Sequence, residues 1–200
     1  LRNRRQRQMC IRDRPYPSCR YSHAAIDGII DLKKELDFSI DDLDDIDIGL
    51  SETALNIIGY PLEDKQNPKS IVDGQFSMPF CAAVAAKSGG LKWDDYKDHL
   101  NNSDTLALCN KIKVNPDKDA EKCCPEFMSA KVKMVVKGKT YEKFVKIPKG
   151  EPENFMKDEE FISKFKGLTE PYLSNKRVNQ LTDLMLKIDQ ANNVLSLIHI

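Results

Sequence analysis

The side chains best suited to chemistry lie between Pro15 and Asp27, where a loop stiffened by two prolines runs into a predicted helix. Ser22 is expected to be the N-cap of that helix, with Arg20 and His23 beside it. A helix N-terminus attracts anions through its unpaired N–H groups and its dipole, and Arg and His add donors that suit a carboxylate. The pattern predicts a small-acid site, and a solvated Arg and a first-turn His without a ligand are the alternative.

Two further segments carry polar residues in suggestive places. Gln75 and Ser77 alternate with small or apolar residues ahead of a buried run, so they could present an amide and a hydroxyl to a substrate. The alternative for this segment is a helix-start capping arrangement with no ligand. Residues 148–152, Pro-Lys-Gly-Glu-Pro, indicate a tight turn, for which a solvated Lys149 is the simpler interpretation.

The elements that position these residues can be predicted from periodicity and turn signals. Two strands, at 130–136 and 140–147, alternate around Lys137-Gly138-Lys139 and predict a β-hairpin. A buried helix is expected over 71–86, started or kinked by Pro79, after a loop at 59–69. The other expected elements are helices at 23–37, 103–109, 158–167 and 175–191 and strands at 46–50 and 111–115. The mixture predicts an α+β fold, with an antiparallel sheet and helices packed on it.

The two ends of the chain differ in composition from the rest. Six of the eight arginines lie in residues 1–14, whereas no lysine precedes Lys33. Residues 1–14 and 195–200 resemble translated sequencing-adapter DNA, and we interpret both as artefacts rather than as a basic nucleic-acid arm or a targeting segment. Without the first segment the net charge is about −5. Nucleic acid is therefore not an expected partner.

Several classes of site are disfavoured. Cysteines 19, 81, 109, 123 and 124 form no C-x-x-C pair, which argues against a zinc or iron–sulfur site, and we expect Cys81 to be a small buried hydrophobe. The aspartates of 41–47 lack the EF-hand pattern, and His99 is expected to be structural. No metal or membrane partner is predicted, and the cysteine usage suggests a cytoplasmic location.

Three segments together resemble the MmgE/PrpD family, which includes 2-methylcitrate dehydratase and cis-aconitate decarboxylase. They are Pro-Tyr-Pro-Ser-Cys-Arg-Tyr-Ser-His-Ala-Ala-Ile-Asp at 15–27, Gly-Gln-Phe-Ser-Met-Pro-Phe at 74–80 and Pro-Lys-Gly-Glu-Pro-Glu-Asn at 148–154. The resemblance covers nearly all of residues 15–194. It implies that 15–170 form the α+β lid domain of the family and that 171–194 begin the return helices of its all-helical domain. A homodimer is the expected state of the full-length protein.

The resemblance also implies a chemistry, the cofactor-free dehydration of 2-methylcitrate to 2-methyl-cis-aconitate, a step of propionate metabolism. A base removes a proton beside a carboxylate while an acid assists the departing hydroxyl. The catalytic groups are expected in the family's helical domain, which this sequence lacks, so the fragment alone is predicted to be inactive. The residues expected to bind substrate are Tyr16, Ser18, Arg20, His23, Gln75 and Ser77.

Two positions depart from the family pattern. A lysine usually precedes Pro-Tyr-Pro, but Arg14 stands here, inside the suspected artefact, and Cys19 lies near the place where some members carry an active-site histidine. Two alternatives to dehydration stay open. One is a relative that decarboxylates cis-aconitate or epimerises a dicarboxylate, and the other is a non-catalytic domain that binds anions or a partner.

Overall fold

The computed structural model describes residues 14–188, which fall into two compact units divided between Phe155 and Met156. The suspected artefacts, apart from Arg14 itself, lie outside the described residues. The domain boundaries inferred from the family resemblance stay a prediction.

The first unit is built on one four-stranded sheet with the order β2-β1-β3-β4. Its strands are β1 (Leu43–Leu50), β2 (Ile112–Pro116), β3 (Ala130–Val136) and β4 (Lys139–Val145). The α+β class is confirmed, but the expectation of an antiparallel sheet is wrong in one respect, because β1 pairs with β2 in parallel. The reason is the long helical connection between these strands, which returns the chain to the end of the sheet from which β1 starts.

The hairpin of β3 and β4 is present as predicted. Its two loop residues, Lys137 and Gly138, have φ values of 51° and 70°. Positive φ at both positions is the geometry that matches the twist of a two-residue hairpin, and glycine adopts it without strain. The local sequence therefore specifies this pairing.

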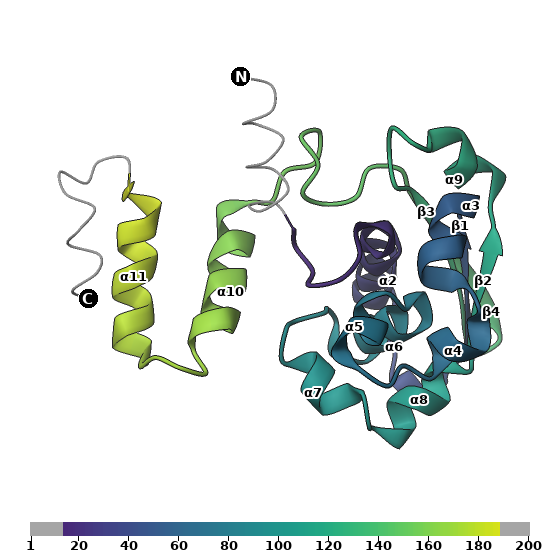
Figure 1. Ribbon diagram of the computed structural model, residues 1–200, viewed down its shortest axis with the longest axis horizontal. Coiled ribbons are helices and arrows are strands. Elements are labelled where there is room, and N and C mark those ends of the chain that lie inside the picture. Colours follow the sequence, from purple (N-terminus) through teal and green to yellow (C-terminus); the bar gives the residue numbers. More distant parts are fainter. Residues whose placement is uncertain (1–13, 189–200) are drawn as a thin grey trace. The chain divides into compact units, whose positions relative to one another are not determined.

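Helices α2 (His23–Leu36) and α6 (Met78–Ser88) pack on each other and against one face of the sheet (Figure 1). The core between these layers contains side chains such as Ile26, Ile29 and Ile46, none of which is exposed. Helix α2 approaches β3 closely at Gly28, where an added Cβ would lie 2.9 Å from Cγ2 of Val132. This approach fixes the height of α2 over the sheet, and so the place of its first turn.

The connection between β1 and β2 is mostly helical. The predicted buried helix at 71–86 is two helices, α5 (Ile71–Gln75) and α6, because Ser77 caps a new helix whose first turn holds Pro79. The predicted loop at 59–69 contains the short helix α4 (Leu62–Gln66). The connection also contains α3 (Glu52–Ala54), η3 (Leu55–Gly59), α7 (Asp95–His99) and α8 (Ser103–Cys109). Outside it, the short 3₁₀ helix η2 (Ile40–Asp42) precedes β1, and α9 (Lys118–Cys123) follows β2.

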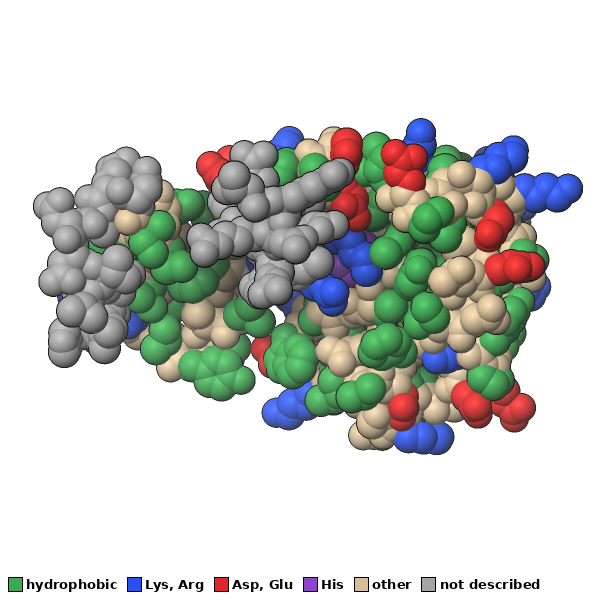
Figure 2. Space-filling view, turned by 45° about the horizontal axis from the view of Figure 1, so that its top comes forward, with side chains coloured by type: hydrophobic (Ala, Val, Ile, Leu, Met, Phe, Trp, Pro, Cys, Tyr) green, Lys and Arg blue, Asp and Glu red, His purple; other side chains and the backbone are tan. Residues whose placement is uncertain are grey.

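Some apolar side chains of these connecting helices are exposed. Examples are Val72 in α5 and Phe76 immediately after it. In Figure 2, hydrophobic side chains gather on the visible face of the first unit, and charged side chains lie mostly towards its margins. Among the described residues, no helix has both the length and the apolar character needed to cross a membrane.

The second unit is a helical hairpin of α10 (Asp158–Thr169) and α11 (Asn175–Leu186), which contact each other. Both helices were predicted. The far end of the second predicted helix, residues 189–191, lies outside the described residues.

Candidate functional site

The loop before α2 is held in place by the segment around Gln75. The carbonyl oxygen of Pro17 accepts hydrogen bonds from Nε2 of Gln75 at 3.1 Å and from the hydroxyl of Tyr96 at 2.9 Å. The backbone N–H of Cys19 donates to the carbonyl of Gln75 at 2.9 Å. Two of the three segments singled out in the sequence therefore meet here, and Gln75 uses its amide to fix the loop.

The start of α2 differs from the prediction. Residues Arg20–Ser22 form a 3₁₀ turn, η1, that runs directly into α2, and the N–H of His23 donates to the carbonyl of Arg20. Ser22 immediately precedes α2, as predicted for an N-cap, but its backbone angles are helical and its side chain makes no capping bond. Its hydroxyl donates to the carbonyl of Cys19 at 2.8 Å and lies 2.7 Å from the hydroxyl of Ser18. These buried hydroxyls close the loop and do not face outward.

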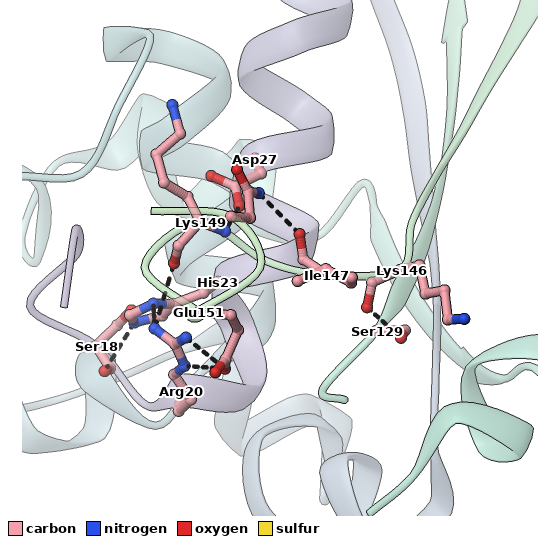
Figure 3. Close-up of polar contacts among 10 residues, drawn as sticks. Ser18, Arg20, His23, Asp27, Ser129, Lys146, Ile147, Lys149 and Glu151 are labelled. Atoms are coloured by element: carbon pink, nitrogen blue, oxygen red, sulfur yellow. Dashed lines mark hydrogen bonds and ion pairs between the residues drawn. The ribbon is translucent and has the colours of Figure 1, made fainter. Parts of the chain in front are cut away.

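Arg20 projects from η1 towards the loop at 148–154 (Figure 3). Its Nε donates to Oε1 of Glu151 at 3.1 Å, and its Nη2 pairs with the same oxygen. Its Nη1 lies 3.2 Å from Nδ1 of His23 and donates to the carbonyl of Lys149 at 3.3 Å. The side chain is only 16% exposed, so the guanidinium is largely withdrawn from water, and its contacts with Glu151, His23 and Lys149 orient it. The first and third segments from the sequence thus meet at Arg20.

His23 is fully buried, and its tautomer follows from its partners. Since an arginine can only donate, Nδ1 must accept the hydrogen bond from Arg20. The proton then lies on Nε2, which faces the carbonyl of Ser18 at 3.4 Å. The ring of Tyr16 packs edge-on against the imidazole, with 5.3 Å between centroids. His23 is therefore placed as a neutral imidazole that orients Arg20.

Asp27 lies one helical turn beyond His23 and was not singled out as a site residue. Its Oδ1 accepts a hydrogen bond from the hydroxyl of Tyr16 at 2.6 Å, and its Oδ2 accepts one from the N–H of Lys149 at 2.7 Å. Burial raises the pKa of this carboxyl, and the two hydrogen bonds oppose that shift. The sequence did contain one signal for Asp27, its spacing from Arg20 and His23, because residues 20, 23 and 27 share one face of a helix.

Ser77 lies fully buried at the start of α6. Its hydroxyl accepts the N–H of Phe80 at 3.0 Å and donates to the carbonyl of Lys65. The capping arrangement considered for this segment is therefore present. A direct contact of Ser77, Gln75, Ser18 or Tyr16 with a substrate stays a prediction.

The thiols and the other histidine contribute packing. Cys81 is fully buried, as expected, and burial raises the pKa of its thiol to about 12. The Nδ1 of His99 hydrogen-bonds to Oγ1 of Thr105 at 2.8 Å, which agrees with a structural role. Within residues 14–188, no three His, Cys, Asp or Glu side chains are grouped so that they could hold a metal ion.

What the site can do follows from its charges. A guanidinium oriented at the start of a helix, and already in contact with a carboxylate, is suited to bind carboxylates.

A model of the MmgE/PrpD C-terminal domain matches residues 16–190, nearly the whole chain. A search of curated proteins found no match.

Proposed function

The chain belongs to the MmgE/PrpD family, and on that premise we propose that it forms the α+β part of an enzyme that removes water from a small tricarboxylic acid, with 2-methylcitrate the foremost candidate. Membership supports a dehydratase-like or lyase-like role at the level of the family. The substrate and the reaction are our proposal.

The observation that carries the proposal is the environment of Arg20. Three of its N–H groups converge on acceptors that include a carboxylate oxygen, in a place that retains little contact with water. Charge-assisted hydrogen bonds of this kind are strong, and planar guanidinium groups recognise carboxylates through paired donors. The site therefore has the chemistry needed to hold one carboxylate of a polyacid.

In the proposed reaction, Arg20 binds a substrate carboxylate next to the carbon that loses a proton. As the C–H bond breaks, negative charge spreads onto that carboxylate, and the fixed guanidinium stabilises it. The electron pair then forms the carbon–carbon double bond while the C–O bond breaks, and the hydroxyl takes up a proton to leave as water. Both nitrogens of His23 are already hydrogen-bonded, so we assign it to orienting Arg20 and not to proton transfer. The proton donor and acceptor are proposed to come from the family's helical domain.

The test is an assay of a protein that carries both domains of the family fold. Incubation with 2-methylcitrate, citrate and cis-aconitate, followed by ultraviolet absorbance of the unsaturated acid and by mass spectrometry, separates dehydration from decarboxylation. Epimerisation of a dicarboxylate would be detected by chiral chromatography. Dehydration of 2-methylcitrate is expected to be fastest, and turnover of none of these acids would contradict the proposal.

Arg20→Ala provides the residue-level test. Loss of a charged hydrogen bond should weaken substrate binding by about 1.5–3 kcal/mol, or roughly ten- to a hundredfold. Glu153→Gln is the matched control, because Glu153 is exposed and lies in the same loop as the partner of Arg20. If Arg20→Ala changes neither kcat nor KM, Arg20 is not part of the site. The 200-residue chain alone is expected to show no turnover.

A further inference from the structure

The carboxylate that contacts Arg20 in this structure belongs to the chain itself. Glu151 lies 131 residues away in sequence, yet one of its oxygens receives both Nε and Nη2 of Arg20 (Figure 3). The Glu151 side chain is 25% exposed, so the pair keeps partial contact with water. A ligand carboxylate that uses the same two donors must take the place of Glu151.

We infer that Glu151 is an internal competitor for the carboxylate position at Arg20, so that ligand binding there requires release of the loop at 148–154. This inference rests on the proposed function, because it assumes that Arg20 is where the substrate carboxylate binds. It assigns Glu151 a role in controlling access to the site.

Local hydrogen bonds allow the loop to keep its shape when it moves. Its ends are tied together by hydrogen bonds from the N–H of Gly150 to the carbonyl of Asn154 at 2.8 Å and from the N–H of Asn154 to the carbonyl of Glu151 at 2.9 Å. The side chain of Asn154 also donates to the carbonyl of Ile147 at 2.9 Å. The first two bonds lie within the loop and the third joins it to the preceding residue, so all three can persist when the loop leaves Arg20.

At least three contacts attach the loop to the start of α2. Arg20 binds the Glu151 carboxylate and the Lys149 carbonyl, and the Asp27 carboxylate accepts the N–H of Lys149. Two of the three depend on Arg20. A ligand that takes over the guanidinium therefore removes two of these contacts at once, while the contact with Asp27 and the burial of Pro148 and Gly150 oppose release.

Competition of this kind has a predictable size. Because Glu151 is tethered beside Arg20, it competes as if it were present at a concentration of the order of millimolar. The apparent affinity for an external carboxylate is the intrinsic affinity multiplied by the fraction of molecules in which Glu151 has left Arg20. Removing the charge of Glu151 should therefore strengthen the binding of an external carboxylate by about tenfold or more.

The experiment is an NMR titration of the 200-residue chain with citrate, which follows the Nε–H signal of Arg20. The unchanged chain, Glu151→Gln and the control Glu153→Gln are compared. Glutamine keeps the size of the side chain, so the loop should retain its fold. We expect citrate to shift the Arg20 signal in all three proteins, about tenfold more tightly in Glu151→Gln, with Glu153→Gln like the unchanged chain.

A second readout reports on the loop itself. Citrate should speed hydrogen exchange at the amide of Lys149, and its neighbour Gly150 should keep its protection because its bond lies within the loop. Equal citrate affinity in the unchanged chain and Glu151→Gln would overturn the inference and leave Arg20 as a binding residue. If citrate does not shift Arg20 in any variant, the inference is also wrong, and turnover by the two-domain protein decides the proposed function separately.

Discussion

The carbonyl of Pro17 offers a sharp test of how the loop before α2 is held. It accepts one hydrogen bond from Tyr96 and another from Gln75. In Tyr96→Phe the ring remains, with its stacking on Phe80 at 5.8 Å between centroids and its contact with Gly74. Only the hydroxyl is lost. Because Gln75 still satisfies the carbonyl, the free energy of unfolding should fall by about 1 kcal/mol.

Gln75→Ala should also cost about 1 kcal/mol, because Tyr96 then satisfies the carbonyl. The double variant removes both donors at once and leaves an acceptor unpaired, a penalty of about 1–3 kcal/mol in a buried setting. Pro17 is only partly buried, so water should reduce that penalty to the lower end of the range. We therefore expect a total loss of about 3 kcal/mol and a coupling energy of about 1 kcal/mol.

Urea denaturation followed by circular dichroism, in a double-mutant cycle of the four proteins, measures this coupling. The Nε–H signal of Arg20 should broaden or shift most in the double variant, because the loop it depends on is loosened. Strictly additive losses would refute the idea that the two donors share one acceptor. An unchanged Arg20 signal in the double variant would show that the loop does not position Arg20.

Three further predictions concern single residues. The pKa of Asp27 is raised, so its protonated form favours folding. The stability that this form contributes should be lost as pH rises above about 4 through the folded-state pKa. Asp27→Asn should flatten that part of a pH profile of stability measured by urea denaturation. Gly28→Val should destabilise the chain by about 1–3 kcal/mol in thermal or urea unfolding, since its Cβ would lie 2.9 Å from Val132, and a neutral result would contradict the close packing of α2 on β3. Maleimide labelling at pH 8, read by mass spectrometry, should modify Cys19 far faster than Cys81, because burial holds the latter as a thiol, and equal rates would contradict its burial.

Much of the local structure could be predicted from the sequence because local patterns specify it. The helical spacing of apolar residues after His23 predicted α2, and Gly138 between two alternating segments predicted the hairpin. The parallel pairing of β1 with β2 could not be predicted in this way. Their connection spans many short helices, and no local signal states at which end of the sheet such a connection returns.

The site was predicted in part, for a related reason. The residue types at 16–23, 75–77 and 148–151 were identified, and so was the chance that Ser77 only caps a helix. Ser22 precedes α2 as predicted but makes no capping bond, because a 3₁₀ turn extends the helix backwards and turns that hydroxyl onto the loop. Asp27 was overlooked, since its importance comes from a partner, Lys149, that lies 122 residues away.

By itself, the sequence determined the family of this chain, its helices and hairpin, and the presence of an arginine and a histidine where a loop enters a helix. Those features depend on residue types and on spacings of a few positions, which the chain carries in every conformation. The tertiary structure decided which groups these side chains use. In it, Arg20 pairs with the carboxylate of Glu151, and the hydrogen bond from Arg20 sets the tautomer of His23. The amide of Gln75 donates to the carbonyl of Pro17. Hydrogen bonds require partners placed within a few tenths of an ångström, and only the packing of distant segments on the shared core brings them that close.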